Sequence, residues 1–290
     1  MYSANVLIMG GDITGKAMIP VVKTREGSYS SFYLSGKVAL KNLEEVLRFE
    51  DMVSSAGFYP YRTDEEGYEE LQANPKMVEE IFTSLMVSRL KSWVRMAEAR
   101  LGGTGVRCFI QPGNDDSFAV DAALQGSGVV VNPEGSVQEI DGKFEMISTG
   151  YTNMTPWHCP RDVSDEELYD RMEKMLSQVK DSRRCIFNVH CPPYGTPIDA
   201  APELDQQMKV KYEAGAIKMI PAGSKAVRKL IEMYEPALGL HGHIHESPGW
   251  TWVGKTLCLN PGSEYTKKVL RGAIVTLSED RVKSYFLAVG

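Results

Sequence analysis

A chain of 290 residues, 43% of them hydrophobic and 24% charged, is long enough to bury a substantial core in one large domain or two smaller ones. Its formal net charge of −6 argues against a general surface for nucleic acid or for an anionic membrane. The five cysteines are scattered and contain no C-x-x-C pair, which indicates a reducing, cytoplasmic setting rather than a disulfide framework. No apolar run approaches the roughly 20 residues of a membrane helix, and no signal peptide is recognisable.

The predicted elements are short apolar strands and amphipathic helices, followed by hairpins. Each apolar run ends in a turn rich in Gly, Asn, Pro or His, and such continuous runs suit strands that are covered on both faces. In chain order the pattern predicts a strand within 5–12, helices within 41–57 and 74–103, a strand within 106–116, a helix within 164–180, a strand within 185–193, a helix within 223–236, a strand within 237–246, and hairpins about Gly254-Lys255 and Glu279-Asp280.

These elements indicate an α/β protein in which a mixed sheet, or two stacked sheets, is flanked by helices. No linker separates an independent domain, so we predict a single domain over residues 1–290. Residues from about 21 to 104 lie between the first two core strands and are expected to form a helical elaboration of that domain.

The first strand runs into Gly10–Ala17, a segment with two interpretations. It matches the G-x-x-x-x-G-K pattern of a phosphate loop, but Ala17 stands where that motif places a Ser or Thr for Mg²⁺. Pro20 and a strand-like segment follow where the motif requires a helix. Asp12 would also put a carboxylate inside a phosphate cradle, so we favour the second interpretation, a metal ligand at a strand end.

Residues that can bind a metal stand at the ends of all four strands. In chain order they are Asp12, Asn114 with Asp115, His190, and His243 with His245. Because ligands bind outside the carboxyl ends of strands in open α/β sheets, we expect these side chains to converge. Imidazole nitrogens mixed with carboxylate and amide oxygens suit one or two divalent ions of Mn, Fe, Zn or Ni.

The series of motifs resembles that of the calcineurin-like metallophosphoesterases and spans nearly the whole chain. It comprises Gly11-Asp12, Gly113-Asn114-Asp115, His190 and Gly242-His243-Ile244-His245, followed by Asn260-Pro261-Gly262-Ser263. The resemblance implies two packed mixed β-sheets flanked by helices in a four-layer sandwich. It also implies phosphoester hydrolysis by two cations about 3.5–4 Å apart, which activate water and clamp the phosphate. By this resemblance Asp12 bridges both metals, Asn114, His190 and His243 complete one site, and His245 binds the other metal.

The chain departs from the family pattern in two places. No Asp-x-His motif precedes Asp12, so we expect either a shortened or misplaced start or an incomplete second metal site. Asp115 stands where many members have a histidine proton donor, and an ionised carboxylate is a poorer acid. The candidate catalytic residues are therefore Asp115, His241 and His158, although a structural role for His241 and a solvated turn at His158 stay open.

The sequence thus predicts a metal-dependent phosphoester hydrolase, a phosphodiesterase in preference to a phosphomonoesterase, that uses metal-activated hydroxide. Its expected partner is a phosphoester substrate, with no general nucleic-acid surface and no membrane contact, and an oligomer is compatible with the sequence. The alternative hypothesis comes from a different class. A catalytically impaired protein of the same fold, serving as a scaffold or interaction protein, would also lack the Asp-x-His motif.

Overall fold

The computed structural model describes residues 4–34, 36–279 and 281–290. Within it the chain divides into two compact units. Unit 1 comprises Met1–Ile13, Met96–Glu264 and Val269–Gly290, and unit 2 comprises Thr14–Arg95 and Tyr265–Lys268. The predicted elaboration at about 21–104 falls largely in unit 2, and the single domain over 1–290 stays a prediction.

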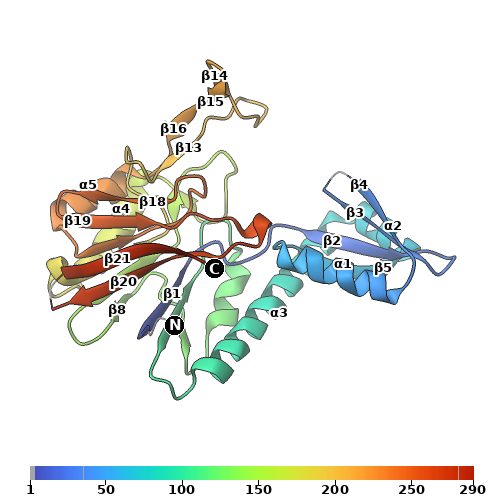
Figure 1. Ribbon diagram of the computed structural model, residues 1–290, viewed down its shortest axis with the longest axis horizontal. Helices are drawn as coiled ribbons and strands as arrows, with labels where there is room; N and C mark the ends of the chain where they lie inside the picture. The colour runs from blue at the N-terminus through green and yellow to red at the C-terminus, as the bar shows by residue number, and fades with distance from the viewer. Residues whose placement is uncertain (1–3, 35, 280) are drawn as a thin grey trace. The chain divides into compact units, whose positions relative to one another are not determined.

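A six-stranded mixed sheet forms the centre of unit 1 (Figure 1). Its middle strand, β12 (Cys185–Val189), pairs in parallel with β9 (Glu145–Thr149) and β17 (Leu238–Leu240). The sheet is completed by β19 (Thr256–Asn260), parallel to β17, and by the antiparallel edge strands β18 (Gly249–Val253) and β8 (Val137–Glu139). The predicted strands at 185–193 and 237–246 and the hairpin about Gly254-Lys255 are confirmed, whereas sequence analysis did not predict β9.

A second layer of strands in unit 1 carries the other two predicted core strands. β1 (Val6–Gly10) pairs in parallel with β6 (Arg107–Gln111), and β6 with β7 (Val130–Val131). The predicted C-terminal hairpin is confirmed as β20 (Arg271–Ser278) with β21 (Arg281–Val289), although Asp280 of its turn lies outside the described residues. The predicted class, α/β with several sheets flanked by helices, is therefore confirmed.

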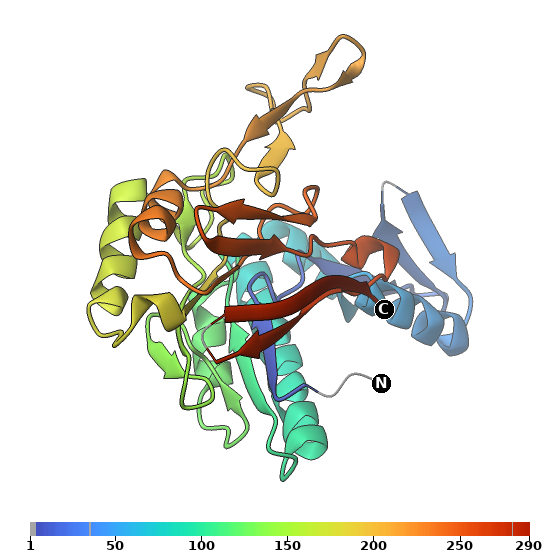
Figure 2. The same cartoon turned by 60° about the vertical axis from the view of Figure 1, so that its left-hand side comes forward.

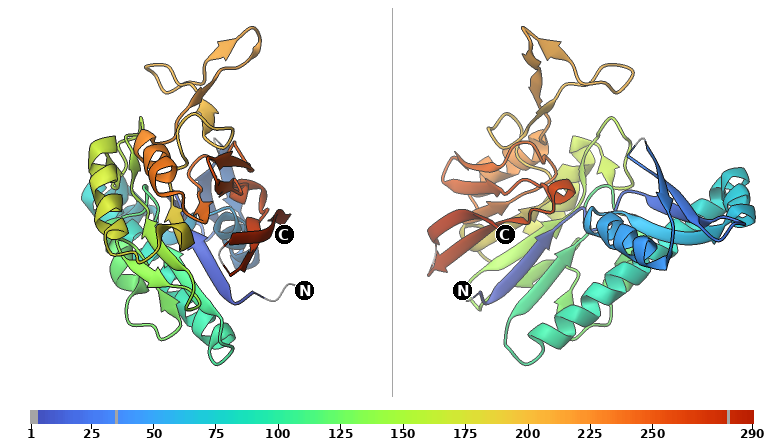
Figure 3. Two further views of the ribbon diagram at one scale, coloured as in Figure 1. Left: turned by 90° about the vertical axis from the view of Figure 1, so that its left-hand side faces the viewer. Right: turned by 45° about the vertical axis from the view of Figure 1, so that its right-hand side comes forward.

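Alternation along β12 separates two apolar cores. Cys185, Phe187 and Val189 pack on the face of the sheet that is covered by α4 (Asp165–Leu176) and α5 (Lys225–Tyr234), which lie side by side in Figures 2 and 3. Ile186 packs on the opposite face with residues of β1, β6, β20 and β21. Since side chains alternate along a strand, the same period places His190 on the face toward β1 and β6.

The helices of unit 1 begin where the sequence predicts. The Ser164 hydroxyl accepts a hydrogen bond from the Glu167 N–H at the start of α4 (3.1 Å), and Ser224 does the same for Val227 in α5 (3.1 Å). Both caps satisfy backbone donors that a helix N-terminus leaves without a partner. The remaining short elements of unit 1 are η1 (Phe118–Leu124), β10 (Thr152–Asn153), β11 (Asp162–Val163), η2 (Ser182–Arg184), β13 (Ala200–Pro202), β14 (Tyr212–Glu213), β15 (Ala216–Ile217) and β16 (Met219–Pro221).

Unit 2 is a four-stranded sheet with helices and has its own small core of Val21, Leu40, Val46, Phe49 and Val53. Its elements are β2 (Met18–Lys23), β3 (Tyr29–Tyr33), β4 (Gly36–Leu40), α1 (Leu43–Ser55), β5 (Tyr59–Asp64), α2 (Glu65–Ala73), α3 (Pro75–Leu101) and η3 (Tyr265–Lys267), with the unit boundary falling inside α3. The predicted helices at 41–57 and 74–103 are confirmed, and α2 was not predicted. Across the described residues, no helix combines the length and the apolar character needed to cross a membrane.

Candidate metal centre

Three of the predicted ligands meet at the strand ends of unit 1. One ligand atom each from Asp12, His190 and His243 lies within 4.8 Å of the other two. Asp12 follows β1, His190 follows β12, and His243 follows β17, so residues from both sheets contribute. The imidazole rings of His190 and His243 stand edge to face with their centroids 5.3 Å apart.

The orientation of His190 leaves one ring nitrogen directed at a carboxylate. Its Nδ1 lies 2.8 Å from the carbonyl oxygen of Gly10, which can only accept a hydrogen bond, so Nδ1 carries a proton. Its Nε2 lies 3.2 Å from Oδ2 of Asp12, yet this buried atom has no hydrogen-bond partner among the described residues. A metal-binding histidine is oriented in this way, with a carbonyl holding one nitrogen and the lone pair of the other facing the ion.

His243 is held in a strained backbone conformation. It occupies the left-handed region at φ 64° as the middle residue of a three-residue turn, in which the Ile244 N–H donates to the Gly242 carbonyl at 2.7 Å. Such conformations persist when the surrounding structure enforces them, and they gather at functional sites. Burial lowers the pKa of His243 to about 4, and the nearby His190 adds to the effect, so its imidazole is neutral at pH 7, as a ligand must be.

Asp12 is also in the left-handed region, at φ 49°. The turn that carries it is joined to the turn after β6 by the buried carboxylate of Asp116, which accepts hydrogen bonds from the backbone N–H of Ile13 (3.0 Å) and of Gly113 (2.6 Å). Sequence analysis did not single out Asp116. A buried carboxylate bound to two backbone donors from different turns fixes the distance between the Asp12 turn and the Asn114 turn.

Glycines make this close approach possible. A Cβ on Gly11 would lie 2.3 Å from Nδ1 of His190, and one on Gly113 would lie 2.2 Å from both the nitrogen and Oδ1 of Asp12. Neither distance is tolerated by real side chains, so each glycine is required by packing at the candidate site.

Gly113→Ala is expected to destabilise the chain by about 1–3 kcal/mol, because the added methyl group must displace the Asp12 turn. Urea unfolding measures the loss, and the same variant should bind Mn²⁺ less tightly in calorimetry. Gly128→Ala is the matched control, because a Cβ there meets no atom within 4 Å. Equal unfolding midpoints for the two variants would contradict this prediction, because they would show that the Asp12 turn accommodates the methyl group without loss of stability.

Asn114 is directed by a second carboxylate that sequence analysis missed. Asn114 is buried, and its Nδ2 donates to Oδ1 of Asp162 at 2.8 Å. This hydrogen bond keeps the NH₂ group of the amide on the side of Asp162, so the amide oxygen faces the other way. Asp162 also accepts hydrogen bonds from the side chain of Thr152 and from the backbone N–H of Thr155 (3.0 Å) and Cys159 (2.9 Å). Burial raises the pKa of Asp162, but its hydrogen bonds from Thr155 and Asn114 outweigh this and lower it below the ordinary value.

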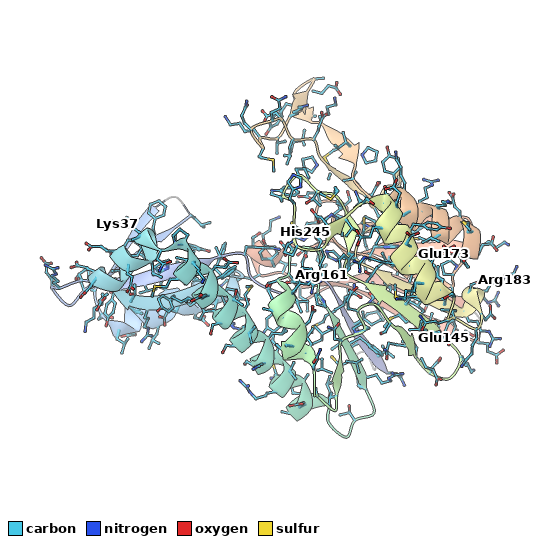
Figure 4. All side chains as sticks on the ribbon, turned by 180° about the vertical axis from the view of Figure 1, so that it is seen from behind. Lys37, Glu145, Arg161, Glu173, Arg183 and His245 are labelled. Atoms are coloured by element: carbon cyan, nitrogen blue, oxygen red, sulfur yellow. The ribbon has the colours of Figure 1, made fainter. Side chains whose placement is uncertain are left out.

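Asp115 and His245 adjoin the three-residue group without belonging to it. The Asp115 N–H lies 3.4 Å from Oδ1 of Asp12. The His245 backbone carbonyl accepts from the Ser263 N–H at 3.4 Å, so the Asn260–Ser263 turn borders the segment that carries both histidines. His245, labelled in Figure 4, is partly buried, and its charge would lower the pKa of His243.

The other two candidate catalytic histidines lie in contrasting environments. His241 is buried, and its Nδ1 lies 2.9 Å from the Val189 carbonyl and 3.0 Å from the Cys191 carbonyl. Burial lowers its pKa to about 4, so it is neutral at pH 7. His158 is exposed on the loop that Asp162 organises, and its backbone is left-handed at φ 51°.

The ligand set fits a transition-metal ion better than it fits a phosphate loop. A carboxylate and two imidazoles, one with a buried ring nitrogen that has no hydrogen-bond partner among the described residues, are donors for such an ion. No helix begins at Lys16, because the chain passes directly into β2 at Met18. The interpretation of Gly10–Ala17 as a phosphate loop is therefore excluded.

The fold and the site define an α/β protein with a candidate metal centre at the strand ends of two packed sheets. No family model matches the chain. The chain is 30% identical over 152 residues to the uncharacterised protein MJ1162 of Methanocaldococcus jannaschii, a match that covers 52% of this chain and 61% of that protein. The chain therefore spans less than two thirds of the length of this relative.

Two solved structures resemble the chain at low sequence identity. The crystal structure of TT1561 of Thermus thermophilus has a TM-score of 0.45 and 14% identity, and the match covers 70% of this chain and 79% of that one. The sulfate thiohydrolase SoxB of Thermus thermophilus, in complex with glycerol, has a TM-score of 0.36 and 12% identity, covering 69% of this chain and 42% of that one. Both likenesses are weak, and neither identifies the chemistry of the site.

Proposed function

We propose that this chain is a metal-dependent phosphoester hydrolase and that its substrate is a phosphodiester. One observation carries the proposal. The Nε2 nitrogen of His190 and a carboxylate oxygen of Asp12 lie 3.2 Å apart, with His243 beside them, in an arrangement that a cation would satisfy. Asp12, His190 and His243 would hold that ion together with the Asn114 amide oxygen, and His245 is the candidate ligand of a second ion.

A bound divalent ion supplies Lewis acidity that polarises a phosphoryl oxygen and stabilises the charge of the transition state. The chain supplies the orientation. The Gly10 carbonyl orients His190, and the Asp162 carboxylate orients Asn114. Asp116 sets the separation of the two turns that present Asp12 and Asn114.

The charge around the site favours a diester over a monoester. Asp12, Asp115 and Asp162 place three carboxylates in one neighbourhood, as their combined effect on the pKa of Cys159 indicates. Arg161, labelled in Figure 4, belongs to the same loop, but it is 1% exposed. Its guanidinium is bound to the carboxylate of Asp121 and the carbonyl of Asp116. A singly charged diester meets less repulsion in such a setting than a dianionic monoester.

Proton delivery to the leaving group is assigned among the three candidate catalytic residues by their environments. Asp115 is an unsuitable acid when ionised. The Nδ1 of His241 is committed to two carbonyl oxygens that flank His190, which suits bracing that segment. We therefore assign the proton-donor role to His158, whose ring is exposed on the loop that Asp162 holds. Since all five cysteines are free thiols, we propose a reducing cytoplasmic compartment.

The test is metal content together with turnover of bis(4-nitrophenyl) phosphate after EDTA treatment and reloading with Mn²⁺, Zn²⁺, Fe²⁺ or Ni²⁺. The wild-type chain is expected to bind at least one ion and to hydrolyse the diester faster than 4-nitrophenyl phosphate. His243→Ala should lower both metal content and turnover about 100-fold, whereas Lys16→Ala, which removes the lysine of the rejected phosphate-loop pattern, should change neither.

Three outcomes contradict the proposal in different ways. Metal binding without turnover of either ester favours the alternative of a scaffold with an inactive site. Faster turnover of the monoester removes the diester assignment. Activity that survives His243→Ala and disappears with Lys16→Ala would place the chemistry at the glycine-rich segment instead.

A further inference from the structure

A β-arm extends from unit 1 between Ala200 and Pro221, after the loop that follows His190. β13 pairs with β16 at its base, and β14 pairs with β15 near its tip. Figures 2 and 3 show the arm standing away from the sheets and helices of unit 1. The base is held by buried Asp199, whose carboxylate accepts hydrogen bonds from the N–H groups of Gly195 (2.8 Å), Thr196 (2.8 Å) and Gly223 (3.0 Å). The arm is therefore a firmly attached extension.

One face of the arm is apolar and open to solvent. Tyr212 and Ile217 are cross-strand partners, and alternation places Val210 and Met219 beside them on the same face. Their exposed fractions are 37% for Val210, 68% for Tyr212, 47% for Ile217 and 43% for Met219. We call these four residues the apolar face of the arm. None of them belongs to the two core clusters of unit 1 described above.

The opposite face carries an ion-pair group and, by the same alternation, Ile220, which is 37% exposed. The Glu203 carboxylate binds the ammonium group of Lys211 at 2.6 Å and that of Lys218 at 2.9 Å. These two hydrogen-bonded partners lower the pKa of Glu203. The arm is thus a ribbon that has an ion-pair group on one face and the larger apolar surface on the other, where it is left facing solvent.

An uncovered apolar face on a two-stranded ribbon is unfavourable. Isolated hairpins are marginally stable in water. The four side chains leave a surface on the order of 400 Å² exposed, which lies in the range of the largest apolar patch of a typical monomer, and such a patch is often functional. Two such faces in contact would remove about 800 Å² of surface, enough to form the centre of an interface of roughly 1,200 Å².

The charges of the arm identify the partner that fits. Its apolar face carries no charge, which disfavours a phosphate-bearing surface. The whole segment 200–221 has three acidic residues (Glu203, Asp205, Glu213) and three basic residues (Lys209, Lys211, Lys218), so its net charge is zero within a chain of net charge −6. Two copies of an acidic chain repel each other in general, but they do not repel at this arm, where each presents the same uncharged face.

We propose that the arm is a dimerisation element, in which the apolar face of one copy packs against the apolar face of a second copy around a two-fold axis. A two-fold contact is closed, because the same patch serves on both partners. The face with the Glu203 ion pairs then stays in water.

The experiment is sedimentation velocity on the full chain over about 1 to 100 µM, a range in which a modest interface dissociates. The wild-type chain is expected to reach twice its mass of 32.2 kDa. Tyr212→Ser with Ile217→Ser removes the two central contacts and should raise the dimer dissociation constant about 100-fold or more. Phe32→Ser, which removes an equally exposed aromatic residue from unit 2 (63% exposed), should leave it unchanged.

Circular dichroism melting checks that every variant is folded, and both arm positions are exposed, so the monomer should keep its melting temperature at low concentration. A wild-type chain that stays at 32.2 kDa throughout overturns the proposal, as does a double variant that dimerises like the wild type. Open-ended association of the wild type, or its co-sedimentation with neutral phosphatidylcholine vesicles as a monomer, also overturns it and points to filaments or to a lipid surface.

Discussion

Asp12→Asn is expected to abolish the stabilisation that metal ions give to this chain and to lower hydrolysis of a phosphodiester by about 1,000-fold. Asp12 supplies the carboxylate of the three-residue candidate centre, and it lies 3.2 Å from the nitrogen of His190 that would share the ion. Asparagine has nearly the same shape, so the substitution removes the charge and keeps the packing.

The measurement is thermal unfolding with and without saturating Mn²⁺, followed by a turnover assay. An ion at about 1,000 times its dissociation constant stabilises the wild-type chain by about 4 kcal/mol, and Asp12→Asn should show no such shift. Asp141→Asn is a matched control, because Oδ1 of Asp141 caps a turn away from the site by accepting from the Lys143 and Phe144 N–H groups, which asparagine can reproduce. Equal metal-induced shifts in Asp12→Asn and the wild type would remove Asp12 from the centre.

Asp162→Asn is expected to weaken metal binding about 10- to 100-fold at a modest cost in stability, since Asp162 is only partly buried. Asp162 accepts hydrogen bonds through both carboxylate oxygens, whereas asparagine accepts through one. The loop contacts with Thr155 and Cys159 favour keeping that single oxygen on their side. The NH₂ group of the new asparagine would then face the NH₂ group of Asn114, and the Asn114 amide must turn its oxygen away from the ion.

This account predicts a rescue. In Asn114→Asp with Asp162→Asn, the new carboxylate at 114 accepts from asparagine at 162 and keeps an oxygen free for the ion, so metal affinity should return to within about tenfold of the wild type. Calorimetric titration with Mn²⁺ measures affinity independently of turnover. Thr152→Val, which removes another donor to Asp162, should leave affinity nearly unchanged. If the double variant binds no better than Asp162→Asn alone, then Asp162 supports only the loop.

The three candidate ligands that the structure brings together were recognisable from sequence because each follows an apolar strand. Asp12, His190 and His243 each follow a continuous apolar strand, and strand ends are visible as the point where the apolar pattern breaks into polar and glycine residues. The same local pattern identified the helices 43–55, 75–101, 165–176 and 225–234 to within a few residues. Local periodicity is sufficient here because it depends on neighbours along the chain.

The residues that the sequence did not reveal act through contacts between distant segments. Asp116 binds the Ile13 N–H across 103 positions, and Asp162 binds Asn114 across 48. An aspartate next to a turn has the same local pattern whether it caps that turn or binds a remote strand. Its role is therefore set by the packing of the loops.

The apolar face of the β-arm was also not recognisable from sequence, because it depends on pairing between strands. The segment 200–221 contains prolines, charged residues and short apolar runs that match no clear period, and no strand or helix is predicted there. The pairing of Tyr212 with Ile217 brings the two side chains onto one face of the arm. Neither residue taken by itself in the sequence predicts this face.

The sequence by itself determined the α/β class, the order along the chain of the four core strands that it predicts and the kind of candidate ligand that follows each of them, since all three depend on patterns of neighbouring residues. Only the tertiary structure decided which of those ligands share one position, which carboxylates orient them, and which face of the arm is left apolar. These features depend on the close approach of backbones at Gly11 and Gly113 and on hydrogen bonds between loops. Such contacts form only after the two sheets have packed together.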